Sequence, residues 1–262
     1  APLDDLDFIL HHLIDLPALA ALPAYVDYGV NHDMAAAIFA EAGKVAADVL
    51  APLNRLGDRE GAQLVDGQVV LPKGFDQIQQ AMSAGGWAGI SMHPDAGGQG
   101  LPQLFNTVVA EFWNSANMAY ALNPILGIGA AHAICAHGTP QQVETYVRPI
   151  GEGRWSGTMN LTEPQAGSDL SAIKTKAVRD GDHYRISGQK IFITWGDHQL
   201  SDNIVHLVLA RLPDAPEGTR GISLFIVPKF LVNGDGSLGA RNDVRCLSLE
   251  HKMGIHASPT CV

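Results

Sequence analysis

The sequence predicts an α+β fold, in which a helical N-terminal part is followed by a part made of strands. Through the first part, apolar residues recur every three or four positions, as on the buried face of a helix. From Arg154 onward they instead form short alternating or continuous runs, which are typical of strands. Gly151-Glu152-Gly153 lies where this period changes and predicts the boundary between the two parts.

Composition argues against several classes of protein. The chain has 262 residues, of which 46% are hydrophobic, and this argues against disorder. The formal charge of −10 argues against nucleic-acid binding. Cys135, Cys246 and Cys261 are widely spaced and fit no metal-ligand pattern, so buried reduced thiols are expected rather than disulfides or a metal site.

Two segments bear on export and membranes. The N-terminus lacks a basic segment followed by an apolar one, so no signal peptide is predicted. The longest apolar stretch, Ala121 to Ala136, is interrupted by Asn123, Pro124 and His132, which predicts a buried core helix rather than a membrane span. A soluble cytoplasmic protein that binds no membrane is the expectation.

The predicted helices of the first part combine an apolar face with start signals. Asp4 or Asp5 can cap the first helix, and Asp33 can cap the second. Residues 139–142 fit a capping box, and Asp66-Gly67 predicts a small hairpin. The expected helical segments are 6–14, 34–53, 75–85, 104–120, 121–137 and 140–147.

A Gly-rich stretch separates two of these helices and runs from Gly89 to Pro102. Taken alone, it predicts a flexible connector. A phosphate-binding interpretation is weak, because the stretch lacks the lysine and the following serine or threonine of a P-loop.

The predicted strands of the second part are 154–161, 174–178, 183–187, 190–194, 204–210 and 222–227. Asp180-Gly181 is expected to form a hairpin turn. The continuously apolar runs 204–210 and 222–227 predict buried strands, and His206 is expected to be a hydrogen-bonded core histidine. Residues 232–242 are rich in Gly and Asn and predict a long turn.

The stretch from Thr158 to Leu170 is the most informative part of the sequence. The pattern predicts a strand that breaks at a Pro/Gly turn, which carries backbone N–H groups, the hydroxyls of Thr162 and Ser168, and two carboxylates. Such a turn can present donors to an electron-rich ring or a phosphate. On chemistry alone, a purely structural turn is the more common explanation.

A second segment, Gly188 to Gly196, favours the ligand-binding interpretation. It is apolar, aromatic and hydroxyl-bearing. Two runs together resemble the flavin-contacting segments of the acyl-CoA dehydrogenases, namely Thr162-Glu163-Pro164-Gln165-Ala166-Gly167-Ser168-Asp169 and Lys190-Ile191-Phe192-Ile193-Thr194. The Gly-rich stretch resembles a loop of the same family near the acyl end of the substrate pocket.

The resemblance implies an FAD cofactor and roles for particular residues. Thr162 and Thr194 would hydrogen-bond the flavin, and Phe192, which stands where many members have Trp, would cover one face of the ring. Ser168 would touch the pantetheine arm of the substrate as well as lie near the cofactor. The implied cofactor-binding residues are Met159, Leu161, Thr162, Ser168, Phe192, Ile193 and Thr194.

The resemblance also implies a domain arrangement. An N-terminal extension over 1–33 would precede a helical domain over 34–153 and a β-barrel-like middle domain over 154–262, which would be truncated. The C-terminal four-helix bundle of the family, which supplies the catalytic glutamate, is absent from this chain. No catalytic residue is therefore assigned, and Glu163 is expected to be structural.

The implied activity is FAD-dependent α,β-dehydrogenation of an acyl-CoA thioester, with electrons passing to an electron-transferring flavoprotein. A homodimer or tetramer would be the assembly. Two alternatives stay open, namely an acyl-CoA oxidase and a flavin-binding relative that no longer dehydrogenates. Within the family, the sequence resembles a branch whose polypeptide chains are about twice as long as this one. That branch includes the methylmercaptopropionyl-CoA dehydrogenases.

Overall fold

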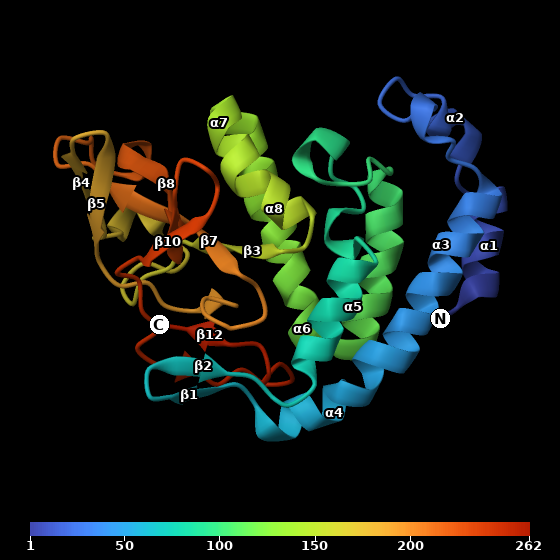
Figure 1. The fold of residues 1–262 in the computed structure, drawn as a ribbon, viewed down its shortest axis with the longest axis horizontal. Coiled ribbons are helices and arrows are strands. Elements are labelled where there is room, and N and C mark those ends of the chain that lie inside the picture. The colour runs from blue at the N-terminus through green and yellow to red at the C-terminus, as the bar shows by residue number, and fades with distance from the viewer.

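The computed structural model describes residues 1–262, and it separates helices from strands along the chain. Figure 1 shows the N-terminal helices on one side of the molecule and the strands of the second half on the other. The helices are α1 (Leu3–His12), α2 (Leu16–Ala20), α3 (His32–Val45), α4 (Ala51–Glu60), α5 (Phe75–Ala84), α6 (Gln103–His137), α7 (Pro140–Gln142) and α8 (Arg148–Gly151). The predicted α+β class is confirmed. The division into domains at residues 33 and 153 stays a prediction.

Two predicted helix caps are wrong. Helix α3 is capped by Asn31, whose side-chain oxygen accepts the N–H of Met34 at 2.9 Å, while Asp33 lies inside the first turn. Asp4 and Asp5 likewise lie in the first turn of α1, after Pro2. These acidic residues still lie at the positive end of a helix dipole, so each predicted helix start was correct to within one turn. The capping box at residues 139–142 is confirmed.

Helix α6 is the longest element of the structure and joins two helices that the sequence predicts separately. It has 35 residues, and only Asn117 has non-helical backbone angles. The Asn117 side chain accepts the N–H of Tyr120 at 3.2 Å, so it caps the second half of α6 from within. The two halves therefore meet at a kink.

The same helix is long and apolar enough to cross a membrane, judged by length and composition alone. Core helices of soluble proteins pass this test too. Here α6 packs against α3, α4 and the strand β3 (Trp155–Asn160), as expected for the buried core helix predicted at 121–136.

The strands form separate sheets rather than one closed barrel. Besides β3, they are β1 (Gln63–Val65), β2 (Gln68–Val70), β4 (Lys176–Asp180), β5 (His183–Ser187), β6 (Ile193–Thr194), β7 (Asn203–Arg211), β8 (Ile222–Pro228), β9 (Phe230–Val232), β10 (Leu238–Arg241), β11 (Leu249–Glu250) and β12 (Thr260–Cys261). The largest sheet has five strands in the order β3-β7-β4-β5, with β8 paired to β7. A three-stranded sheet, β11-β12-β6, lies apart from it, and β1-β2 and β9-β10 are hairpins.

Three strand predictions need correction. Only Ile193–Thr194 of the predicted strand 190–194 pairs in a sheet, because Phe192 has a left-handed backbone with a φ of 61°. Strand β8 forms but is mostly half-buried, since it lies at the edge of its sheet. The predicted long turn at 232–242 is instead largely the β9-β10 hairpin.

The Gly-rich stretch is a packed element and not a flexible connector. A Cβ atom on Gly98 would overlap the carbonyl of Met92, and one on Gly151 would overlap the carbonyl of Ala96. These glycines therefore let the stretch lie backbone to backbone against the end of α8. The stretch is held directly at the junction where the helices give way to β3.

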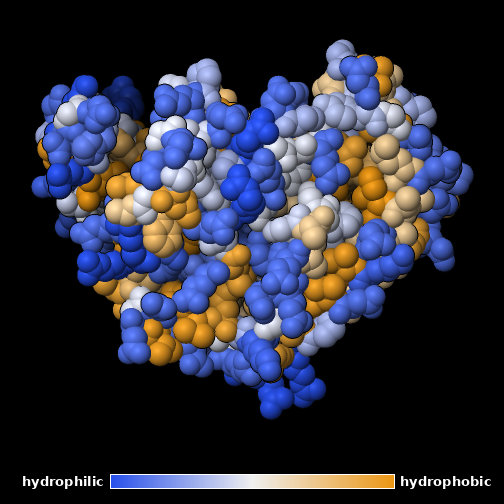
Figure 2. All heavy atoms as spheres, in the orientation of Figure 1, coloured by the Kyte–Doolittle hydropathy of each residue, from blue (hydrophilic) through white to orange (hydrophobic).

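The surface is hollowed where the large sheet faces the end of α6 and α7. This groove has a volume of about 1310 Å³ and is lined by residues of α6, α7, β5 and β8. Figure 2 shows the notch between the strand-bearing side and the helices, and apolar side chains exposed in several separate groups.

Candidate functional site

The two motif segments predicted to contact a flavin lie side by side. The N–H of Ile191 donates to the carbonyl oxygen of Thr162 at 2.9 Å. The ammonium of Lys190 donates to the carbonyl oxygen of Leu161 at 3.0 Å. Residues that are 29 positions apart in the sequence are thus joined at the point where the chain leaves β3.

Glu163 fixes the turn between these segments. Its side chain is 3% exposed and accepts from the N–H groups of Lys174 at 2.7 Å and Thr175 at 3.1 Å. It also accepts from Gln165 Nε2 at 2.7 Å and forms an ion pair with Lys190 Nζ at 2.8 Å. One carboxylate therefore ties together three separate stretches of chain.

The same contacts exclude Glu163 as a general base. Burial by itself would raise the pKa of this carboxyl, but the bonds from Lys190 and the two backbone N–H groups outweigh burial and lower the pKa to about 2. A base that acts near neutral pH needs a much higher pKa. The geometry agrees with the structural role expected from the sequence.

The segment around β6 has an unusual backbone. Phe192 and Trp195 both have left-handed angles, with φ of 61° and 54°. Bulky residues rarely adopt this region, so their occurrence on either side of Ile193 and Thr194 marks a constrained turn. Ile193 packs in a small buried cluster with Val69 and two cysteines, so only its backbone can face a ligand.

The predicted cofactor-binding side chains differ in how available they are. Thr162 and Thr194 are part-buried, and neither hydroxyl forms a hydrogen bond within the chain, so both are free to bind a ligand. Phe192 is 45% exposed, and the ammonium of Lys252 lies 4.0 Å from its ring centroid. Ser168 is exposed on the turn, whereas Met159 packs against a core cluster.

These residues fit a flavin dinucleotide. The N–H groups of Gly167, Ser168 and Asp169 donate to no backbone carbonyl of the chain, and together with the free hydroxyls they offer donors for ring and phosphate oxygens. The exposed Phe192 ring offers an apolar face for a flat ring system. No group of three or more His, Cys, Asp or Glu side chains lies close enough together to hold a metal ion.

Two neutral histidines lie in the core behind β3. Thr158 donates to Asn160 Oδ1 at 2.6 Å and lies 2.7 Å from Nδ1 of His206, which therefore donates to the Thr158 hydroxyl. Burial lowers the pKa of His206 to about 4 and that of His198 to about 3. His206 is thus a hydrogen-bonded core histidine, as predicted, and His198 contacts Ser156 at 2.9 Å in the same way.

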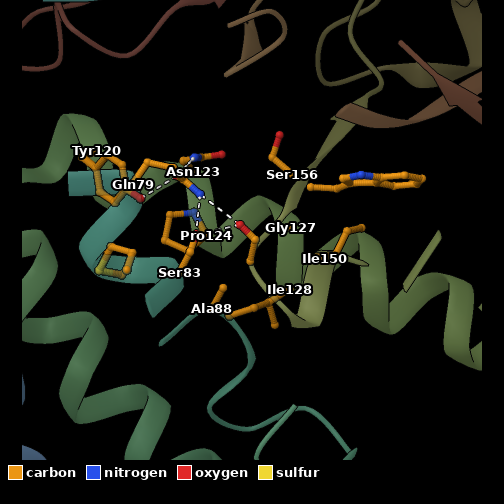
Figure 3. A pocket seen from close by; sticks show the side chains of 13 residues that line it. Gln79, Ser83, Ala88, Tyr120, Asn123, Pro124, Gly127, Ile128, Ile150 and Ser156 are labelled. Atoms are coloured by element: carbon orange, nitrogen blue, oxygen red, sulfur yellow. Dashed lines mark hydrogen bonds between the residues drawn. The ribbon is translucent and has the colours of Figure 1, made fainter. Parts of the chain in front are cut away.

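A small polar cavity lies where α5, α6 and β3 meet. Its volume is about 30 Å³, enough for a water molecule. Figure 3 shows Gln79, Tyr120 and Asn123 around it, with Tyr120 donating to Gln79 Oε1 at 2.8 Å. The side-chain oxygen of Asn123 is buried without a partner, so we expect an ordered water there.

Sequence reasoning missed the roles of Lys190 and Lys252. Lys190 is the one charged residue of the run from Lys190 to Thr194, so its role as the counter-ion of Glu163 had a detectable signal. Nothing local in the sequence indicates that Lys252 reaches Phe192, because 60 positions separate them.

Comparison with known proteins identifies the family to which the chain belongs. Residues 32–154 match the family model of the acyl-CoA dehydrogenase N-terminal domain, and residues 158–262 match that of the acyl-CoA dehydrogenase middle domain. The chain therefore belongs to the acyl-CoA dehydrogenase family, and the predicted resemblance is confirmed.

Within that family, 3-methylmercaptopropionyl-CoA dehydrogenase of Ruegeria pomeroyi is 48% identical over 263 residues, which cover 100% of this chain and 44% of that protein. A butyryl-CoA dehydrogenase of Syntrophomonas wolfei is 38% identical, over 98% of this chain and 42% of that protein. The chain spans less than half the length of these curated relatives.

Solved structures share the fold. Butyryl-CoA dehydrogenase of Megasphaera elsdenii matches with a TM-score of 0.68 and 26% identity, over 87% of this chain and 54% of that one. A chain from a structure of the electron transferring flavoprotein of Acidaminococcus fermentans matches with a TM-score of 0.69 and 29% identity, over 90% of this chain and 55% of that one. An acyl-CoA dehydrogenase of Bacillus anthracis, solved as a complex with FAD, has a TM-score of 0.68 at 23% identity, over 87% and 35% of the two chains.

Proposed function

We propose that this chain is the flavin- and substrate-contacting part of an FAD-dependent enzyme that removes two hydrogens from adjacent carbons of an acyl-CoA thioester. The observation that carries the proposal is the junction of the two motif segments. The bond from Ile191 N–H to Thr162 places those segments side by side while the hydroxyls of Thr162 and Thr194 stay free. Family membership supplies the reaction class.

In this proposal FAD, when bound, supplies the hydride acceptor. Thr162 and Thr194 donate hydrogen bonds that orient the flavin ring, and Phe192 covers one face of it. Leu161 and Met159 contribute backbone and packing contacts, and Ser168 contacts the pantetheine arm of the substrate. Preorganised donors of this kind hold the reacting atoms without further reorganisation.

The general base that removes the α-proton is proposed to lie outside this chain. Of the two carboxylates in the turn from Thr162 to Asp169, only Glu163 is buried, and its pKa of about 2 makes it unsuitable as a base. The curated relatives are more than twice as long, so their remaining parts have room for such a residue.

We further propose that the complete protein is a cytoplasmic homodimer or tetramer that passes electrons to an electron-transferring flavoprotein. One relative supports the partner, because the caffeyl-CoA reductase-Etf complex subunit CarC of Acetobacterium woodii is 33% identical over 68% of this chain. An acyl-CoA oxidase would bind the same cofactor and substrate but would pass its electrons to oxygen.

The decisive test is the visible absorbance spectrum of the complete protein before and after anaerobic addition of acyl-CoA thioesters. We expect a flavin band that bleaches with at least one acyl-CoA. A flavin band that persists with every acyl-CoA would instead identify a relative that binds flavin without dehydrogenating. Absence of a flavin band even after FAD is added would show that the two motifs are only scaffold.

Replacing both Thr162 and Thr194 with alanine is expected to weaken FAD binding roughly 30-fold, because two hydrogen bonds worth about 1 kcal/mol each are lost. The measurement is FAD affinity by fluorescence titration of the stripped protein. Thr107→Ala is the matched control, since that hydroxyl bonds only to the carbonyl of Gln103 on the exposed side of α6. An unchanged affinity and an unchanged rate of flavin reduction in the double variant would rule out the roles given to both threonines.

A further inference from the structure

We propose that Trp195 is a positioning residue, which holds Thr194 toward the cofactor by tying strand β6 to the kink of helix α6. This inference rests on the proposed flavin site. Trp195 is fully buried, with 0% of its surface exposed. Its indole N–H donates to the carbonyl oxygen of Ala119 at 3.0 Å, across 76 positions of sequence.

The backbone of β6 needs such support. Phe192 and Trp195 have φ values of 61° and 54°, so the two residues that flank Ile193-Thr194 are both held in a left-handed conformation. This conformation costs free energy for bulky residues and persists only where several contacts fix it. A turn free to relax would change the direction in which the Thr194 hydroxyl points.

Backbone contacts provide part of that support. The N–H of Trp195 donates to the carbonyl of Pro259 at 2.8 Å, and Thr194 pairs with Thr260 in β12. Gly196 follows, where a Cβ atom would lie 2.8 Å from the Cβ atom of Cys261. These contacts fix the segment to its own sheet, and the chain just before β12 is tied to α4 by His256 Nδ1, which lies 2.8 Å from the carbonyl oxygen of Asp58. None of them joins the segment to α6.

The indole provides the link to helix α6. The Trp195 ring meets Tyr120 edge-on at 6.0 Å and His198 edge-on at 5.3 Å between ring centroids. Ala119 and Tyr120 lie just after Asn117, the residue at which α6 kinks and whose side chain donates to the carbonyl oxygen of Leu50 at 3.2 Å. Trp195 therefore connects the strand that carries Thr194 to the one break in the central helix.

The consequence is that the position of Thr194 depends on the helical half of the molecule. A shift of the second half of α6 would move Ala119 and would be transmitted to β6 through the indole N–H. Trp195 does not itself face the cofactor, since it is enclosed between α6 and the core around His198.

The test is Trp195→Phe in the complete protein, which keeps an aromatic ring and removes the N–H donor. We expect FAD affinity to fall about 5-fold, the amount that loss of one hydrogen bond allows. We expect kcat for flavin reduction to fall about 10-fold while KM for the acyl-CoA changes less than about 2-fold. This is the pattern expected of a residue that aligns the reacting groups but does not bind the substrate.

Trp113→Phe is the matched control. Trp113 is also buried, in the core of the helices, but its indole donates no hydrogen bond and it meets only Trp87 edge-on. Both variants should lose thermal stability, and only Trp195→Phe should change FAD affinity and kcat. If both variants lose similar stability and neither changes those two quantities, Trp195 is a packing residue and the inference is wrong.

A second readout does not need the cofactor. In the protein stripped of FAD, Trp195→Phe should speed amide hydrogen exchange at position 195 and at Gly196, and Trp113→Phe should not. Equal protection of this segment in all three proteins would overturn the inference. A wild-type protein that binds no FAD would contradict the proposed function instead, while the exchange measurement would still decide whether the indole holds the turn.

Discussion

Lys190→Met is expected to lower the free energy of unfolding by about 3–5 kcal/mol, because it leaves a buried carboxylate without its counter-ion. The side chains of Lys190 and Glu163 are 9% and 3% exposed and lie 2.8 Å apart. Burial lowers the pKa of Lys190 and the Glu163 charge opposes that shift, so each ion depends on the other. Urea denaturation at pH 7, followed by circular dichroism, measures the change.

Lys44→Met is the control for this prediction. Lys44 and Glu41 form an ion pair of similar length, 3.1 Å, but their side chains are 68% and 59% exposed. Exposed pairs of this kind contribute about 0–1 kcal/mol, so this variant should unfold almost as the wild type does. Equal effects of the two variants would show that burial of the Lys190 pair has no energetic consequence.

A double variant separates loss of charge pairing from loss of packing. Lys190→Met combined with Glu163→Gln removes both charges, and the neutral amide is less costly to bury than an unpaired carboxylate. The double variant should therefore be more stable than Lys190→Met alone. A double variant that is less stable than either single variant would contradict the assignment of the cost to an unpaired charge.

The second large effect is the contribution of Glu163 to the loss of stability at acid pH. Its pKa falls from the ordinary 4.5 to about 2 in the folded protein. A carboxyl with a lowered folded pKa stabilises the protein fully above its unfolded pKa, and this stabilisation is lost as pH falls toward the folded pKa. The shift corresponds to about 3 kcal/mol in total, of which about 2 kcal/mol should be lost between pH 7 and pH 3.

The measurement compares wild type and Glu163→Gln by urea denaturation at several pH values from 7 to 3. At pH 7 the variant should be the less stable protein. The difference in free energy of unfolding between wild type and variant should decrease by about 2 kcal/mol as pH falls to 3. Glu41→Gln is the control, because Glu41 is paired on the surface and should leave the pH profile of the wild type unchanged. A gap that stays constant from pH 7 to 3 would show that the folded pKa of Glu163 is not lowered.

Apart from the helix caps placed at Asp4 or Asp5 and at Asp33, predictions that depend on neighbouring residues in the sequence agree with the structure. The capping box at 139–142 and the Asp66-Gly67 hairpin use bonds between residues a few positions apart. The strand at 204–210 was predicted from a continuous apolar run, and β7 is buried along most of its length. Each of these signals is contained within the segment that it describes.

Predictions fail where distant parts of the chain compete for the same residues. The predicted strand 190–194 shortens to Ile193–Thr194 because Lys190 and Ile191 bond to Glu163 and Thr162, and Phe192 between them and the strand has a left-handed backbone. The two helices predicted at 104–137 become one kinked helix, since Asn117 provides an internal cap in place of a loop. The Gly-rich stretch packs closely because its glycines meet Gly151 and its neighbours.

The sequence by itself was enough to predict the α+β class, the order of helices before strands and the two segments that resemble flavin-contacting motifs. These depend on local periodicity and on short runs of particular residues, which need no knowledge of the fold. Tertiary structure decided which side chains support those segments. The Lys190–Glu163 pair and the Trp195–Ala119 bond join residues 27 and 76 positions apart, and only folding brings such groups within hydrogen-bonding distance in a site that excludes water.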